Sequence, residues 1–305
     1  MLKRKTKNNI FVICLLVVPT AHFLVFWLYV NFSSLLLGFR NSATGAFSLE
    51  HFTRFFDAVK QDFAEGGGVK TAIGNTLITT AKTMFFDMPL TILATYVLFR
   101  KFFGHMFFRV AFYLPGIIGD VIIVGMTSYI LGANGPVVVW GQKLGIDWGF
   151  DVFQTGLLGN SRTARPAFFL TAIGVSGGMV ILLTGALSRI PKDLFDYGKL
   201  EGLGFFKELY YLIVPLIWST IGIMWVMSFA GSWGDYSRVL LLTNGAYDTE
   251  NFGIYMMKYT IGYARGADVA LGYPAAIGMI LTVVVLPVTL FLRWISNKLI
   301  RPVEF

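Results

Sequence analysis

The sequence is poor in the residues on which most enzyme and metal sites depend. It has one cysteine, Cys14, and three histidines among 305 residues. A lone cysteine cannot form an internal disulfide, and the histidines show no spacing typical of a metal site. No grouping of serine, histidine and carboxylate typical of a hydrolase is evident. We therefore expect a non-enzymatic chain that binds no metal and no cofactor itself.

Charge is scarce as well. Only 14% of the residues are charged, whereas soluble domains are typically about a quarter charged. Hydrophobic residues make up 55%, and the mean hydropathy is +0.66, which is typical of a polytopic membrane protein. The net charge of +8 could indicate nucleic-acid binding, but the basic residues are scattered between apolar runs. Membrane topology explains them better, so we expect contact with membrane lipid and no nucleic-acid partner.

Six segments are apolar over about the 20 residues that a spanning helix needs. They are residues 10–29, 73–99, 110–131, 166–187, 213–233 and 271–295. The first could instead be a signal peptide, but its apolar run exceeds the roughly 7–15 residues of a signal core, and no small-x-small site follows. We expect an all-α polytopic fold with six transmembrane helices. Most lysines and arginines gather in short segments on one side, so both termini are predicted to be cytoplasmic.

A charged segment, RIPKDLFDYGKLEGLGFFKELYYLIVP at residues 189–215, lies between two of the most apolar runs. Pro191 suits the first turn of a helix because its φ is fixed near the helical value. Gly202 can adopt the left-handed conformation that ends a helix, and Gly204 permits a change of direction before a second helix at 205–212. We predict a short cytoplasmic helix, parallel to the membrane, that transmits movement between the membrane and a partner. The alternative is an ordinary amphipathic loop.

This segment resembles the EAA loop of binding-protein-dependent ABC importer permeases, whose pattern is roughly E-A-A-x-x-D-G-A with a proline further on. Asp196 stands at the family's glutamate, Glu201 at its aspartate, Gly202 at its glycine and Pro215 at its proline. The resemblance covers nearly the whole chain and is closest to the carbohydrate branch, in particular the larger maltose-type permease subunit. It extends to residues 69–80, 112–126 and 272–285.

Three residues depart from the family's pattern, because Tyr197, Gly198 and Leu203 each replace an alanine. Alanines suit a tightly docked helix, whereas a tyrosine needs a pocket in the partner or points towards lipid headgroups. Glycine inside a helix also lowers its stability by roughly 0.5–1 kcal/mol relative to alanine. The family resemblance is therefore stronger than the docking geometry that it implies.

The resemblance implies a type I ABC importer permease fold in a bacterial cell membrane. Residues 1–70 would hold the N-terminal tail, first transmembrane helix and outer loop, residues 71–295 the permease domain with a coupling loop at 189–212, and residues 296–305 a cytoplasmic tail. The implied partners are a second homologous permease subunit, two cytoplasmic ATPase subunits holding ATP and Mg, and an extracytoplasmic solute-binding protein that delivers a carbohydrate, in particular an oligosaccharide. The residues implied in ATPase coupling are Asp196, Tyr197, Gly198, Glu201, Gly202 and Leu203.

The resemblance also implies a sugar site, counted from the coupling motif. In the fifth predicted span, Ser228 and Ser232 lie four residues apart on one helical face, with Trp225 nearby. In the fourth, Thr171 and Val175 have the same spacing, with Gly174 beside them. Small hydroxyls can bind a sugar and an aromatic face can stack on it. The alternative is helix packing, which uses the same small residues.

Two charged residues, Lys82 and Asp87, lie within the second predicted span. Ionisable residues at such depth usually face the bundle or a wet cavity. Because positions i and i+5 do not share a face of an α-helix, we expect the two to have different partners. Asp87 is either structural or the coupling residue of a proton- or ion-driven secondary transporter. A third possibility, a membrane enzyme acting on lipid-linked sugars, needs a catalytic cluster that the sequence does not show.

Overall fold

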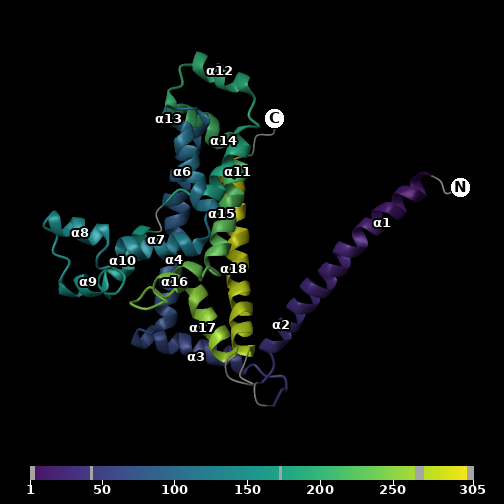
Figure 1. Cartoon of the computed structure of the whole chain (residues 1–305). Helices are drawn as coiled ribbons and strands as arrows, with labels where there is room; N and C mark the ends of the chain where they lie inside the picture. Colours follow the sequence, from purple (N-terminus) through teal and green to yellow (C-terminus); the bar gives the residue numbers. More distant parts are fainter. Residues whose placement is uncertain (1–3, 42–43, 172–173, 265–270, 301–305) are drawn as a thin grey trace. The chain divides into compact units, whose positions relative to one another are not determined.

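The computed structural model describes residues 4–41, 44–171, 174–264 and 271–300, and throughout this part the chain forms helices joined by loops (Figure 1). The first helices follow each other closely from the N-terminus: α1 (Arg4–His22), α2 (Val30–Gly38), α3 (Glu50–Glu65), α4 (Gly68–Lys82), α5 (Met88–Phe99), α6 (His105–Ile117), α7 (Asp120–Leu131), α8 (Pro136–Lys143) and α9 (Phe150–Thr155). The later ones are α10 (Ala164–Thr171), α11 (Gly177–Leu187), α12 (Lys192–Leu200), α13 (Phe205–Lys207), α14 (Val214–Leu216), α15 (Trp218–Ser232), α16 (Ser237–Leu242), α17 (Phe252–Ala264) and α18 (Gly272–Leu299).

Short π-helical segments continue three of these helices without a break. They are Phe23–Tyr29 between α1 and α2, Thr83–Asp87 between α4 and α5, and Glu208–Ile213 between α13 and α14. A π-helix forms i→i+5 hydrogen bonds and inserts an extra residue into the helical turn. Side chains that an α-helix would separate can therefore come to lie on one face.

Four helical stretches of the described chain are long and apolar enough to cross a membrane, namely Phe11–Gly38, Gly68–Phe99, Val121–Lys143 and Gly272–Leu299. A fifth is formed by Phe205–Leu216 and Trp218–Ser232, which are bent by 76° relative to each other. These stretches agree with the predicted all-α membrane fold. The six-helix count and the cytoplasmic placement of both termini stay predictions.

Two predicted spans are wrong as continuous helices. The segment 110–131 divides into α6 and α7 because Ile118 and Gly119 are extended, with ψ of 131° and 145°. The segment 166–187 divides into α10 and α11, and α11 is only 11 residues long. Pro115 in α6 cannot donate a backbone hydrogen bond, and Gly174, Gly177 and Gly178 weaken a helix near the second break. Apolarity alone did not reveal these breaks.

The chain divides into two compact units, Met1–Lys60 with Met256–Val283 and Gln61–Tyr255 with Val284–Phe305. In the first unit the end of α2 lies against α18. A side chain at Gly38 would collide with Met279 and approach the Ala276 backbone, so glycine permits this contact. His51 is buried beside Tyr273, with its Nε2 atom 3.0 Å from the Arg40 carbonyl oxygen. These contacts join the outer loop to the start of α18.

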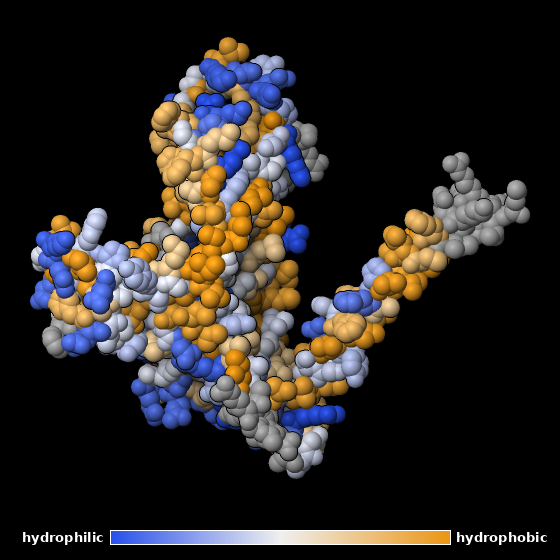
Figure 2. All heavy atoms as spheres, in the orientation of Figure 1, coloured by the Kyte–Doolittle hydropathy of each residue, from blue (hydrophilic) through white to orange (hydrophobic). Residues whose placement is uncertain are grey.

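The second unit carries the features that matter for function. One of its hydrophobic cores joins α5, α11, α12 and α15, and Figure 1 places α12 at one end of this unit, beyond α13 and α14. Buried residues of this core are Met88, Tyr96, Leu183, Leu187, Ile190, Phe195, Ile213, Ile217, Ile221 and Met224. Hydrophilic side chains gather at the end with α12, whereas hydrophobic ones cover the helices next to it (Figure 2). That distribution fits a membrane-embedded body with a polar end.

Candidate functional site

The predicted coupling helix forms as α12 and ends at Gly202. Gly202 has a φ of +71°, the left-handed conformation expected from the sequence. The Leu203 amide donates to the Gly198 carbonyl and the Gly202 amide to the Lys199 carbonyl, each at 3.0 Å. This pair of bonds is the Schellman motif, which satisfies the last carbonyl groups of a helix. The prediction for Gly202 is confirmed.

The other two loop predictions need correction. Pro191 precedes the helix with a ψ of 136°, so the first turn begins one residue later, at Lys192. Gly204 has a φ of −73° and a ψ of 168°, and a side chain there would meet open space. Such extended backbone is available to any residue. The change of direction after α12 therefore depends on Gly202 and not on Gly204.

The two faces of α12 differ in burial. Phe195 and Gly198 are buried, and a Cβ atom at Gly198 would lie 3.4 Å from Leu203 and 3.5 Å from Leu212. These are ordinary van der Waals distances, so the family's alanine would also fit at this position. The opposite face is exposed and carries Tyr197, whose exposed fraction is 64%, and Leu200. An exposed face with large apolar side chains is typical of a surface that another protein covers.

The acidic residues of the coupling motif are also exposed. Asp196 accepts a hydrogen bond from Lys199 Nζ at 2.7 Å, and Glu201 lies at the end of α12. The hydrogen bond and the positive charge of Lys199 lower the pKa of the Asp196 carboxyl below its ordinary value. The motif therefore presents an ionised carboxylate to solvent. Such a group can contact a basic residue of a partner.

A second set of contacts, not predicted from the sequence, attaches the coupling segment to the end of α5. Phe195 lies against Phe99 and Phe205 against Tyr96, with ring centroids 5.6 and 4.8 Å apart. Nearby, Arg100 Nη2 lies 3.3 Å from Oε2 of Glu208, a fully buried carboxylate. The sequence held one signal for this ion pair. Arg100 directly follows the apolar run 73–99, and Glu208 lies just before the apolar run 213–233.

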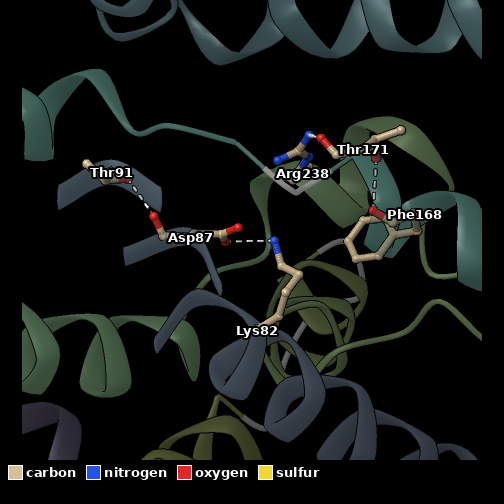
Figure 3. Close-up of polar contacts among 6 residues, drawn as sticks. All are labelled: Lys82, Asp87, Thr91, Phe168, Thr171 and Arg238. Carbon is tan, nitrogen blue, oxygen red and sulfur yellow. Dashed lines mark hydrogen bonds and ion pairs between the residues drawn. The ribbon is translucent and has the colours of Figure 1, made fainter. Parts of the chain in front are cut away.

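The structure overturns the expectation that Lys82 and Asp87 have different partners. Lys82 Nζ lies 2.8 Å from Asp87 Oδ2, and both side chains are largely buried (Figure 3). The physical reason is the π-helical segment Thr83–Asp87, whose wider turn brings positions i and i+5 to one face. The pairing gives both charges a partner within the apolar helix, as the structural interpretation of Asp87 requires.

A cavity of about 570 Å³ lies beside this ion pair. Asp87 and Thr83 line it from one side, and Arg238 from α16 lies in its wall. Arg238 Nη2 donates a hydrogen bond to the Thr171 carbonyl at 2.5 Å (Figure 3). The other lining residues are Phe112, Pro115, Ile123, Val124, Thr171, Gly174, Val175, Ser176, Met179, Asp235 and Ser237. A cavity of this size is typical of a small-molecule site.

The three site residues predicted in the fourth span all line this cavity, but not as a helical stack. α10 ends at Thr171, and Gly174 and Val175 lie in the non-helical stretch before α11. The expected i, i+4 stacking of Thr171 on Val175 is therefore wrong. The Thr171 hydroxyl donates to the Phe168 carbonyl at 2.9 Å. The hydroxyl hydrogen of Thr171 is thus already donated within α10 and is not available to a ligand in the cavity.

The residues predicted in the fifth span lie at helix contacts. Ser232 Oγ lies 2.6 Å from Thr80 Oγ1 on α4, and Trp225 Nε1 donates to the Met84 carbonyl at 3.1 Å. Ser228 Oγ is buried and has no hydrogen-bond partner among the described residues. These contacts favour the packing alternative for Ser232 and Trp225. Ser228 stays a candidate for sugar binding.

No protein-family model matches the chain, but individual proteins do. The multiple sugar-binding transport system permease protein MsmF of Streptococcus mutans is 24% identical over 302 residues, covering 97% of this chain and 98% of MsmF. The probable starch degradation products transport system permease protein AmyD of Thermoanaerobacterium thermosulfurigenes is 26% identical over 204 residues, 62% of each chain.

The fold also matches a solved structure. A chain of the bacterial alginate ABC transporter, solved in complex with an alginate pentasaccharide-bound periplasmic protein, superposes with a TM-score of 0.78. The match covers 99% of both chains at 20% sequence identity. At that identity the match establishes the fold, and the sequence relatives add the kind of protein. In its fold this chain matches an ABC transporter permease, and in its sequence it is similar to permease subunits of carbohydrate transport systems.

Proposed function

We propose that this chain forms half of the translocation pathway of an ATP-driven oligosaccharide importer in a bacterial cytoplasmic membrane. Its partners would be a second permease subunit, two cytoplasmic ATPases that hold ATP and Mg, and an extracytoplasmic solute-binding protein. Six crossings and two cytoplasmic termini are part of this proposal. The names of its relatives support the substrate class, since MsmF is a multiple sugar-binding system protein and AmyD serves starch degradation products.

The observation that carries the proposal is the geometry of α12. The helix has one exposed face, with Asp196, Tyr197 and Leu200, and one buried face that packs onto the end of α5. A partner that binds the exposed face would move α5 through the aromatic contacts and the Arg100–Glu208 ion pair. This is the arrangement that coupling to an external ATPase needs.

Movement of α5 would reach the cavity directly. α5 continues without a break from the π-helical segment that holds Asp87 at the cavity wall. Closure of the ATPases on ATP would thus shift α12, then α5, and open the cavity outward. Release of nucleotide would return it inward. The permease needs no hydrolytic residue for this cycle, because the ATPases supply the energy.

Co-purification tests the proposed docking. The tagged permease, expressed with its transporter subunits, is purified from membranes and the bound ATPase is quantified. We expect Asp196→Lys to weaken ATPase retention roughly tenfold or more, because it places like charges at the contact. Asp151→Lys is the matched control, since it makes the same change at an exposed position in α9. Equal retention in the two variants, or no ATPase with the unmodified chain, contradicts the proposal.

A further inference from the structure

Asp87 lines the cavity, and one of its two carboxylate oxygens is buried without a hydrogen-bond partner among the described residues. Its residue is only 7% exposed, and Oδ2 is held by Lys82 at 2.8 Å. Its backbone carbonyl accepts a hydrogen bond from Thr91 Oγ1 at 2.6 Å. Oδ1 is buried and accepts no hydrogen bond from any described residue. Because buried polar atoms are almost always hydrogen-bonded to protein, water or a ligand, this acceptor beside a cavity is a candidate partner for a donor bound there.

We propose that Asp87 Oδ1 accepts a hydrogen bond from a hydroxyl group of a neutral saccharide in this cavity, and that Asp87 thereby determines substrate specificity. This inference rests on the proposed function, since it assumes that a sugar passes through the cavity. It gives Asp87 a part in recognition in addition to its pairing with Lys82. Carboxylate oxygens form stronger hydrogen bonds to donors than neutral acceptors do, so one such atom has a measurable effect.

The ion pair explains how a carboxylate can serve this role inside a membrane protein. An unpaired charge at this depth is costly, and Lys82 offsets that cost while occupying only one of the two oxygens. The π-helical turn places Lys82 and Asp87 on one face, where the pair forms. Figure 3 shows Lys82 reaching the carboxylate from its own helix, while Arg238 is directed to Thr171.

The charges around the cavity favour a neutral saccharide over an acidic one. Two carboxylates, Asp87 and Asp235, line it with one guanidinium, Arg238, and Asp87 is also paired with the Lys82 ammonium, so these groups carry no net positive charge that would attract an acidic sugar. One nitrogen of that guanidinium already donates to the Thr171 carbonyl. The carboxylate of a uronic acid next to Asp87 would bring two acceptors and two like charges together. A neutral sugar offers hydroxyl donors without that repulsion.

The first test neutralises the ion pair with nearly isosteric side chains, in the variant Lys82→Gln/Asp87→Asn. The complete transporter is reconstituted, and ATP-driven uptake is measured for a neutral trisaccharide that the unmodified transporter carries, chosen from maltotriose and raffinose. We expect the variant to assemble and to show a KM raised roughly tenfold or more, as for loss of a charged hydrogen bond. We also expect it to discriminate less against trigalacturonate. An unchanged KM and unchanged discrimination contradict the inference.

The second test leaves the ion pair intact and asks whether the sugar occupies the cavity beside Asp87, which the inference requires whether or not the double variant assembles. Thr83 lines the same cavity and is half-buried, and Thr83→Cys is nearly isosteric. A charged methanethiosulfonate reagent should modify this cysteine more slowly when the trisaccharide occupies the cavity, as read by mass spectrometry of the peptide. The unmodified chain, whose one cysteine Cys14 lies within the span Phe11–Gly38, gives the background labelling. Labelling that the sugar does not slow contradicts the inference.

The outcomes separate this inference from the importer function. In one outcome the unmodified transporter takes up the trisaccharide with ATP, while the double variant keeps its KM and discrimination and the sugar does not slow labelling of Thr83→Cys. In that case only the inference about Asp87 fails. If the unmodified transporter carries trigalacturonate as well as the neutral sugar, the proposed specificity is wrong. If uptake by the unmodified transporter does not require ATP, the proposed function itself fails.

Discussion

Gly202 ends α12 in a backbone conformation that other residues adopt only at a cost. Its φ of +71° places it in the left-handed region, where an L-residue loses roughly 1–2 kcal/mol. No atom lies within 4 Å of the position that its Cβ would take, so the cost of a substitution is one of backbone strain and not of collision. At Gly204, too, no atom lies within 4 Å of the Cβ position. The backbone there is extended, however, so a substitution causes no backbone strain.

This contrast gives a matched pair of variants, Gly202→Val and Gly204→Val. We expect Gly202→Val to reduce ATPase retention or the amount of sugar transported per ATP hydrolysed, because the Schellman end of α12 must rearrange. Gly204→Val should behave as the unmodified chain. Both quantities are measured on the reconstituted transporter. Equal behaviour of the two variants contradicts the role assigned to Gly202.

The two serines of α15 also give opposite expectations. Ser232 bonds to Thr80 across the contact of α15 with α4, whereas the Ser228 hydroxyl is buried without a described partner. Ser232→Ala leaves Thr80 to find another partner, and we expect it to lower the stability of the purified complex by about 1 kcal/mol. Ser228→Ala should leave stability unchanged, and it should raise the KM for sugar if Ser228 is a site residue. Thermal unfolding and uptake kinetics measure the two effects.

Among the elements, the attachment of the coupling segment to α5 is the feature with most consequence for mechanism. The ion pair between Arg100 and Glu208 joins the end of α5 to the π-helical segment that follows α13. Removing one partner of a buried pair typically costs about 3–5 kcal/mol. We expect less here, because the Arg100 side chain is 36% exposed.

A double-mutant cycle isolates this contact. Glu208→Gln and Arg100→Gln should each lower thermal stability and the sugar transported per ATP hydrolysed. The double variant should lose less stability than the sum of the two, because it leaves no unpaired buried charge. Strictly additive losses would show that the two side chains act independently and that α5 is driven by the aromatic contacts alone.

The elements show where sequence reasoning succeeds and why it stops. The first, second and last spans were located from continuous apolar runs, and the end of α12 from Gly202, because both signals are local. The π-helical turn at Thr83–Asp87 was not predicted, since periodicity arguments assume an α-helix, and this hid the Lys82–Asp87 pair. The Arg100–Glu208 contact joins residues far apart in the sequence. No local pattern announces such a contact.

At the scale of the whole molecule, the membrane helices expose large apolar side chains. In the second unit, Phe85, Phe86 and Ile223 are well exposed, as expected for helices that meet lipid or a second permease subunit. Within the same unit, α12 packs on the end of α5, and α5 continues from the π-helical segment whose Asp87 lines the cavity. The central claim is that ATP hydrolysis on a partner moves these helices and thereby drives sugar through the cavity. A secondary transporter using Asp87 would instead draw on a proton gradient.

Uptake of a labelled neutral oligosaccharide into proteoliposomes tests this claim most directly. The complete transporter is reconstituted with its solute-binding protein outside, and ATP and an imposed proton gradient are varied independently. We predict uptake that requires hydrolysable ATP and does not change when an ionophore collapses the gradient, because Asp87 is held in an ion pair with Lys82. Uptake that follows the proton gradient without ATP would contradict the claim.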